Sequence, residues 1–347
     1  MAEALKWYEK AGNCSDVVYS TRVRLARNLR QYPFPNRATV EQKQEIEAKI
    51  RDALISGNSA IASQFSFVPL EKLTDEEAVS LVERHIVSPE FISDRRNKAL
   101  LLSEDESISI MINEEDHLRI QVMKEGLLLK EAAEAADRLD TLLGETLQFA
   151  FDPEFGYLTQ CPTNLGTGMR ASVMLHLPAL TESGAMSRIA ANLSKLGLTL
   201  RGSYGEGSQI VGGMYQLSNQ ITLGLSETEA IDNLGAIAAQ LIEQERKTRE
   251  EWASNIVLQD KIERAAGVLK SAKMLSSGEF MELLSYIRLG ISVGLLKGVG
   301  MEELNGLFVR MQPATLAASV QKPIDAGERD ILRAEQTRKI CANITEA

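Results

Sequence analysis

The 347-residue sequence has few cysteines and few histidines, three of each. Cys14, Cys161 and Cys341 lie far apart and none belongs to a Cys-x-x-Cys pair, so the sequence predicts neither a disulfide framework nor a structural zinc site. The spacing of the histidines is not typical of metal ligands. We therefore expect no protein-bound metal, and the cysteine pattern favours a reducing compartment such as the cytoplasm.

Long hydrophobic runs and an excess of positive charge are also missing. No apolar segment reaches the roughly 18 residues that span a bilayer, and the first ten residues, MAEALKWYEK, lack the apolar core of a signal peptide. The 38 Lys and Arg residues against 48 Asp and Glu give a net charge of −10, which excludes a broad electrostatic attraction to nucleic acid. We expect neither a membrane nor a nucleic-acid partner.

The order of the residue patterns divides the chain into two parts. Apolar and polar residues alternate over residues 99–123 and 198–224, which predicts antiparallel strands. After residue 227 the pattern is almost entirely helical, and we expect no strand beyond about residue 225. The sequence therefore predicts an α/β (α+β) catalytic domain over residues 1–250, with an antiparallel sheet flanked by helices, and an all-helical domain over residues 251–347.

Five short clusters concentrate arginine, carboxylate and glycine. Taken singly, each has an ordinary explanation: a strand arginine is usually solvated, an acidic run is usually a turn, and a lone cysteine usually packs as a small apolar residue. Together, arginines from separate segments can converge on a polyanion, because guanidinium groups bind phosphate oxygens in pairs. The clusters are STRVR (residues 20–24), NEEDHLR (113–119), CPTNLGTGMR (161–170), RGSYGEG (201–207) and RDILRA (329–334).

The first four clusters, in this order and spacing, resemble the motifs of the phosphagen kinases, the family of arginine and creatine kinases. The resemblance covers residues 17–224, and CPTNLGTG followed by an arginine is its most specific part. Within the family, the sequence is similar to the bacterial protein-arginine kinases, which also carry an RDxxRA element. The resemblance implies the phosphagen kinase catalytic fold and an ATP-dependent kinase that phosphorylates arginine side chains of proteins.

The resemblance also implies a role for each motif residue. Glu115 and Glu206 would hold the substrate guanidinium, near the reactive Cys161. Mg²⁺ is expected between the ATP phosphates. The motifs include no dedicated acidic metal cluster, which fits a metal held mainly by nucleotide and water. Ser20, His85 and five arginines would contact the nucleotide; the arginines are Arg22, Arg24, Arg119, Arg170 and Arg201.

The chemistry of phosphoryl transfer accounts for these residue types. Arginines neutralise and align the phosphates, which is most of what such a reaction needs from a protein. A guanidinium has a pKa above about 12 and is a poor nucleophile, so paired carboxylates are needed to orient it and accept a proton. We expect Glu115 to act as the base and Glu206 mainly to orient the guanidinium.

RDILRA permits two interpretations. Arg329 and Arg333 are four residues apart, so they share a helix face with Asp330 beside them, which an ordinary solvated helix surface explains. The resemblance implies instead a phosphoarginine pocket, in which the two arginines bind the phosphate and Asp330 binds the guanidinium.

The kind of substrate follows from a departure from the family pattern. Kinases of free guanidino compounds place a helical domain before the first motif, whereas STRVR begins here at residue 20, so we expect an open site that admits a side chain. Two alternatives stay open: a kinase of free arginine or another small guanidino compound, and a non-catalytic adaptor that binds phosphoarginine. The adaptor is disfavoured because the arginines and both glutamates are intact.

The resemblance further implies a physiological setting. It suggests that proteins are marked for quality control or that a stress repressor is regulated. The implied partners are a zinc-binding activator, a heat-shock repressor and a Clp protease. The helical domain is a reasonable surface for a homodimer.

Overall fold

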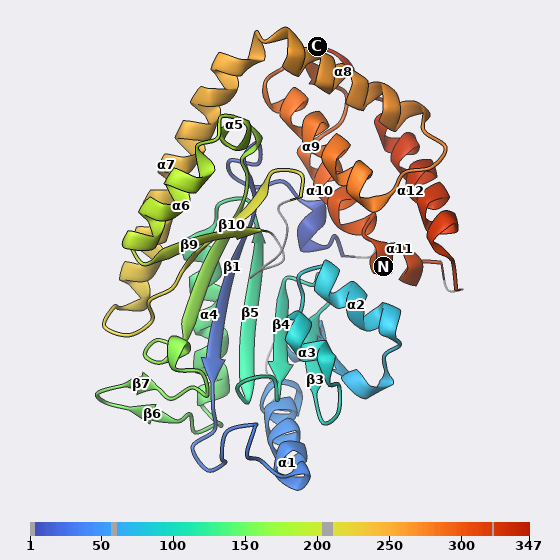
Figure 1. Cartoon of the computed structure of the whole chain (residues 1–347). Helices are drawn as coiled ribbons and strands as arrows, with labels where there is room; N and C mark the ends of the chain where they lie inside the picture. The colour runs from blue at the N-terminus through green and yellow to red at the C-terminus, as the bar shows by residue number, and fades with distance from the viewer. Residues whose placement is uncertain (1–3, 57–60, 203–210, 321–322) are drawn as a thin grey trace.

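The computed structural model describes residues 4–56, 61–202, 211–320 and 323–347. Its centre is an eight-stranded sheet in which every neighbouring pair is antiparallel, as the sequence predicts (Figure 1). The strands, in sheet order, are β2 (Phe65–Pro69), β3 (Ala99–Ser103), β4 (Ile108–Ile112), β5 (Leu118–Glu125), β1 (Val18–Arg27), β8 (Met169–His176), β10 (Met214–Asn219) and β9 (Leu198–Gly202).

Apolar and polar residues alternate along the central strands, so one face of the sheet is apolar there and the other carries polar side chains. On β1, Val23 and Leu25 are buried in the main core, and the intervening Arg24 points to the opposite face. Arg24 is paired with Gln121 of β5 on one side and with Arg170 of β8 on the other. Residues directly opposite each other in an antiparallel pair share a face, so the polar face collects arginines from several strands.

Helices cover the apolar face. Apolar residues of α1, α4 and α7 pack in the core beneath the strands, and capping boxes at Thr39 and Ser226 begin α1 and α7. Two short helices, α2 and α3, pack instead over Leu100 and Met111 on the other face. The helices of this part are α1 (Val40–Arg51), α2 (Asp75–Glu83), α3 (Pro89–Ser93), α4 (Leu129–Gly144), α5 (Pro178–Glu182), α6 (Met186–Lys195) and α7 (Glu227–Ala253); β6 (Phe151–Asp152) and β7 (Gly156–Tyr157) form a separate hairpin.

The remaining helices gather at one end of the sheet (Figure 1). Their core also contains Tyr19, Met123 and Met174 from the sheet, so this part packs directly against the strands. The expectation of no strand after residue 225 is wrong, because β11 pairs with β12; two-residue strands are too short to show a periodic pattern. The elements are α8 (Ile256–Ser271), α9 (Ser277–Ser292), β11 (Leu296–Lys297), α10 (Met301–Arg310), α11 (Pro313–Ala318), α12 (Ala326–Cys341) and β12 (Thr345–Glu346).

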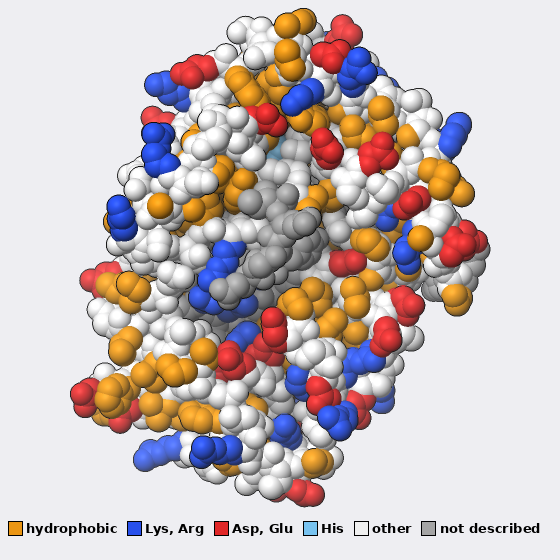
Figure 2. All heavy atoms as spheres, viewed as in Figure 1, with side chains coloured by type: hydrophobic (Ala, Val, Ile, Leu, Met, Phe, Trp, Pro, Cys, Tyr) orange, Lys and Arg blue, Asp and Glu red, His pale blue; other side chains and the backbone are white. Residues whose placement is uncertain are grey.

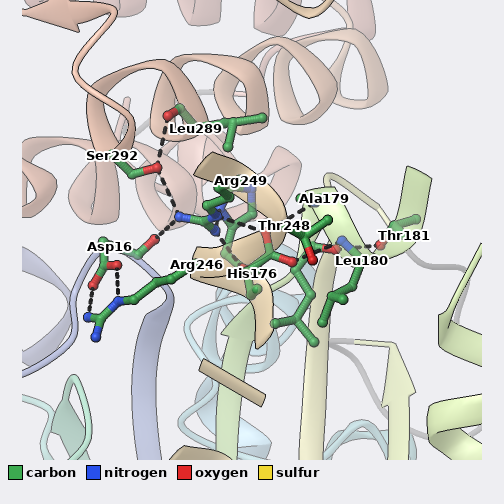
Figure 3. Close-up of polar contacts among 12 residues, drawn as sticks. Asp16, His176, Ala179, Leu180, Thr181, Arg246, Thr248, Arg249, Leu289 and Ser292 are labelled. Atoms are coloured by element: carbon green, nitrogen blue, oxygen red, sulfur yellow. Dashed lines mark hydrogen bonds and ion pairs between the residues drawn. The ribbon is translucent and has the colours of Figure 1, made fainter. Parts of the chain in front are cut away.

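A buried arginine near the end of α7 joins the two parts. Arg249 donates to the main-chain oxygen of His176, at the end of β8, at 2.8 Å, and to the hydroxyl of Ser292, at the end of α9, at 2.9 Å (Figure 3). Its charge is balanced by Glu245 at 2.7 Å, and both side chains are buried. Removing one partner of such a buried ion pair lowers the free energy of unfolding by about 3–5 kcal/mol. The pair therefore stabilises the contact between the two parts of the chain. The domain boundary at residue 250 stays a prediction; α7 runs across that position without a break.

No helix in the described ranges has both the length and the apolar character needed to cross a membrane.

Candidate active site

A cavity of about 830 Å³ opens on the polar face of the sheet. Figure 2 shows Lys and Arg side chains in a hollow of this face, with Asp and Glu side chains along one border. Four segments form its walls: the sheet, the end of α2 with the start of α3, the turn at residues 113–116 (the NEED turn) and the loop at residues 160–168 (the CPTN loop). The predicted residues that line the cavity are Arg22, Arg24, His85, Glu115, Arg119, Cys161, Arg170 and Arg201.

The arginines at the base of the cavity repel one another. Burial and the charges of Arg170 and Arg119 lower the pKa of Arg22 to about 10. Burial and the charges of three neighbouring arginines lower the pKa of Arg24 well below its usual value, and the carboxylate of Glu114 opposes this shift. Like charges held together in a half-buried site are unfavourable. A bound polyanion would relieve this repulsion, so the cavity is suited to phosphate groups.

Neutral side chains hold Arg22 in place. Its Nη2 donates to Oε1 of Gln216 at 2.7 Å, and its Nε donates to Oγ of Ser172 at 3.3 Å. Because amide and hydroxyl oxygens carry no net charge, these contacts orient the guanidinium and leave its charge available to a ligand. Sequence reasoning missed Gln216 and Ser172, although the two-residue period of β8 and β10 puts both on the arginine face.

The NEED turn uses two of its three carboxylates to hold the site together. Glu114, 4% exposed, accepts from Nη1 of Arg119 and from the hydroxyl of Ser88, both at 2.8 Å. Asp116 accepts from the main-chain nitrogen of Gln160 at 2.8 Å, which ties the turn to the CPTN loop. Glu115 is the most accessible of the three at 37%, and contacts Nη2 of Arg119 at 3.0 Å. Of the three carboxylates in this turn, Glu115 is therefore the one most accessible to a ligand in the cavity.

The CPTN loop places Cys161 and Asn164 at the cavity wall. Asn164 lies 3.4 Å from Oε2 of Glu115, and Sγ of Cys161 lies 3.0 Å from the hydroxyl oxygen of Thr163. The loop needs glycine at Gly166, where φ is +107° and a Cβ atom would lie 2.2 Å from the main-chain oxygen of Thr222. The loop thus packs tightly on the segment after β10, with Cys161 and Glu115 at the same cavity.

His85, two residues after the end of α2, forms part of another wall of the cavity. It has a left-handed backbone conformation with φ of +59°, and burial together with the charge of Arg22 lowers its pKa to about 3. The imidazole is therefore neutral at physiological pH. Its main-chain oxygen accepts from Nε2 of Gln121 at 2.8 Å, which fixes this wall to β5.

The other predicted site residues either do not line the cavity or are not among the described residues. Ser20 is on β1 but is buried and does not line the cavity. Glu206 lies outside the described residues, so its predicted role stays a prediction. The RDILRA element lies on α12, as the sequence predicts, and none of its residues lines the cavity.

Within RDILRA, the two arginines differ in environment. Arg333 is 1% exposed, and its guanidinium donates to the main-chain oxygens of Met311 and Leu275 at 2.8 and 2.7 Å and to Asp330 at 2.6 Å. Arg329 and Asp330 are half-buried and remain accessible. In this conformation Arg333 holds the ends of neighbouring helices against α12.

Comparison with known proteins gives two family matches. Residues 45–248 match the family model described as ATP:guanido phosphotransferase, C-terminal catalytic domain. Residues 255–347 match the model described as protein-arginine kinase McsB C-terminal domain.

Similar proteins agree with these matches. A protein-arginine kinase of Caldanaerobacter subterraneus is 45% identical over 92% of this chain and 95% of its own length. One of Brevibacillus brevis is 44% identical over 96% of this chain and 94% of its own. Among solved structures, lombricine kinase aligns with a TM-score of 0.60 and 27% identity, covering 70% of this chain and 71% of its own. The duplicated taurocyamine kinase of Schistosoma mansoni aligns with a TM-score of 0.61 and 27% identity, over 78% and 40%. The chain belongs to the protein-arginine kinases, within the ATP:guanido phosphotransferase family.

Proposed function

We propose that this chain transfers the terminal phosphoryl group of ATP to the guanidinium group of arginine side chains in proteins. The observation that supports this best is the cavity in which arginines from several strands face the accessible Glu115. In the transfer, the bond between the γ-phosphorus and the bridging oxygen breaks, its electron pair leaves with ADP, and a nitrogen–phosphorus bond forms. The guanidinium gives up one proton.

The arginines would bind the triphosphate. Guanidinium groups match phosphate oxygens in pairs, and fixed cations stabilise charge that develops on the transferring group. Arg24 and Arg170 face each other across the β1–β8 pair, which suits a group held between them. Arg22, Arg119 and Arg201 would complete the set, and the neutral His85 would contact the nucleotide without adding charge.

Glu115 would hold the acceptor. A carboxylate repels phosphate but pairs with guanidinium, and at the moment of transfer it can take the proton that the nucleophilic nitrogen loses. Glu206 would grip the guanidinium from the second side, and Cys161 would lie beside it at the cavity wall.

Mg²⁺ would be held mainly by the ATP phosphates and water. Magnesium prefers oxygen ligands and keeps several waters. Both cavity carboxylates of the NEED turn are ion-paired with Arg119, and in the described part of the chain no three His, Cys, Asp or Glu side chains are placed to bind a metal together. The donor set thus fits a metal that enters with the nucleotide and neutralises its phosphates.

Phosphoarginine binding at α12 is part of the proposal in a modified form. Arg329 and Asp330 are accessible to a ligand, whereas Arg333 is engaged with main-chain oxygens. Arg329 would contact the phosphate and Asp330 the guanidinium. The quality-control role, the activator, repressor and protease partners, and the homodimer stay predictions from the family resemblance.

The acceptor class can be tested directly. We would offer an unfolded arginine-bearing protein, the same protein with lysine at every arginine, and free arginine at equal guanidinium concentration. Phosphate from labelled ATP should enter the first and not the second. Faster transfer to free arginine than to the protein would favour a kinase of small guanidino compounds, and no transfer to any acceptor would favour the adaptor.

A further inference from the structure

The short helix α11 begins without a cap of its own. Its N-cap residue, Gln312, makes no side-chain hydrogen bond to the first turn; its side-chain nitrogen donates instead to the main-chain oxygen of Phe308. The first main-chain N–H groups of a helix have no partner within the helix, and leaving them unsatisfied is costly. The start of α11 therefore needs an acceptor from elsewhere.

Glu83, at the end of α2, supplies that acceptor. Its Oε1 accepts from the main-chain nitrogen of Ala314 at 2.9 Å, and its Oε2 accepts from the nitrogen and hydroxyl of Thr315 at 2.6 and 2.8 Å. A second contact lies beside it, between the hydroxyls of Ser80 and Thr315 at 3.3 Å. The positive end of a helix dipole also favours a carboxylate at this position. A side chain more than 200 residues away in sequence thus caps α11.

The residues that flank Glu83 form one wall of the cavity. Val82 and His85 both line it. His85 follows α2 in the left-handed conformation, and its main-chain nitrogen donates to the oxygen of Val82, in the last turn of α2, at 2.9 Å. A shift of Glu83 therefore moves the two neighbours that border the proposed nucleotide site, because all three belong to the same helix end.

The start of α11 is also fixed from its other side. The main-chain oxygen of Met311, just before the N-cap residue, accepts from Nε of Arg333 at 2.8 Å. Residues 311–315 are thus held between α12, which carries RDILRA, and α2, which borders the cavity. Arg333 is thus connected to His85 in three parts: its hydrogen bond to Met311, the hydrogen bonds of the start of α11 to Glu83, and the two peptide links from Glu83 to His85.

We propose that Glu83 is a positioning residue for nucleotide binding, through which the helical part of the chain sets the cavity wall formed by Val82 and His85. It acts through α2 and touches no ligand itself. The proposal rests on the proposed function, because it requires that ATP binds in this cavity. It predicts that weakening the Glu83–α11 contact lowers ATP affinity even when both helices stay folded.

The test is the affinity of the full-length Glu83→Gln variant for Mg·ATP, measured by calorimetric titration. The substitution keeps the shape of the side chain and removes the charge that caps α11. We expect the dissociation constant to rise by about 5-fold or more, as for typical coupling between sites, and kcat at saturating ATP to change little. Glu76→Gln is the matched control: Glu76 is an exposed acid on the same helix and should leave the affinity unchanged.

Thr315→Val guards against a folding defect in the first variant. It removes the hydroxyl that donates to Glu83 and contacts Ser80, leaves the two main-chain donors to Glu83 in place, and should raise the dissociation constant by a smaller factor than Glu83→Gln. A purely structural cap would lower the thermal midpoint of both variants and leave their ATP affinity at the wild-type value, which would overturn the proposal. Failure of the wild-type chain to bind ATP would remove the proposed function as well, whereas normal wild-type binding with unchanged variants removes the inference alone.

Discussion

Arg24 of β1 lies directly opposite Arg170 of β8 in the sheet register, on the face that opens into the cavity. Two like charges at opposite positions destabilise an antiparallel pair. The folded chain tolerates this arrangement at a site where burial already lowers the pKa of Arg24. A phosphate bound between the two arginines would offset their repulsion, so the arrangement favours phosphate binding.

Arg170→Ala should weaken phosphoryl transfer far more than a change of surface charge does. Loss of a clamp on the transferring group costs about 3 kcal/mol or more in transition-state stabilisation, or over a hundredfold in kcat/KM. Arg170→Lys should not restore activity, because one ammonium group cannot replace a bidentate guanidinium. Steady-state kinetics decides this, with the exposed Arg264→Lys as control. Near-normal turnover of Arg170→Lys would remove Arg170 from the transferring phosphoryl.

Glu115→Gln should abolish phosphoryl transfer and leave ATP affinity almost unchanged, because the carboxylate of Glu115 is proposed to bind the acceptor guanidinium and not the nucleotide. Glu206→Gln should behave in the same way. Glu114→Gln should reduce ATP affinity as well as turnover, since Glu114 holds Arg119 and Ser88 in place. Calorimetric ATP titration beside turnover measurements separates the three variants. If Glu115→Gln loses ATP affinity but still turns over, the assignment of Glu115 to the acceptor is wrong.

The two arginines of RDILRA should give opposite results. Arg329→Ala should remove charge-assisted hydrogen bonds worth about 1.5–3 kcal/mol to bound phosphoarginine and leave stability unchanged. Arg333→Ala should mainly destabilise the helical part, because its guanidinium holds main-chain oxygens of Met311 and Leu275. Titration of free phosphoarginine and thermal unfolding of both variants test this. If wild type does not bind phosphoarginine, RDILRA has a structural role only.

The free energy of unfolding should fall as the pH is lowered from about 6.5. Burial lowers the pKa of His85 to about 3 and that of His117 to about 4, and holds the pKa of His176 well below its ordinary value. The unfolded chain therefore takes up protons that the folded chain does not, at up to about 1.4 kcal/mol per histidine and pH unit. Urea unfolding at pH 7.5 and 5.5 measures this; an unchanged free energy would show that the histidines titrate normally.

The sequence predicted the parts of the site that lie in local motifs. In the five-residue motif STRVR, Arg22 and Arg24 are two positions apart, so the sequence alone indicates that they share one face of an extended segment. The antiparallel strands and the helix that carries RDILRA were likewise predictable, because each has its own periodic pattern.

The contacts between distant segments could not be predicted. The position of β1 between β5 and β8 depends on strand order, which a single strand does not encode. Glu83 belongs to none of the sequence motifs, and the sequence left Arg333 as either a solvated or a phosphate-binding cation; both residues bond to main-chain atoms of distant segments. Main-chain groups are the same in every residue, so no sequence pattern marks them as partners.

The proposed reaction transfers phosphate to a guanidinium nitrogen of a protein. The most direct measurement is mass spectrometry at neutral pH of an arginine-bearing protein incubated with the enzyme and Mg·ATP, beside an acid-treated aliquot. We predict phosphate localised on arginine, lost in acid and retained in mild alkali, as expected of a phosphoramidate. Phosphate that survives acid and maps to serine, threonine or tyrosine would show that the acceptor is a hydroxyl group and not a guanidinium nitrogen.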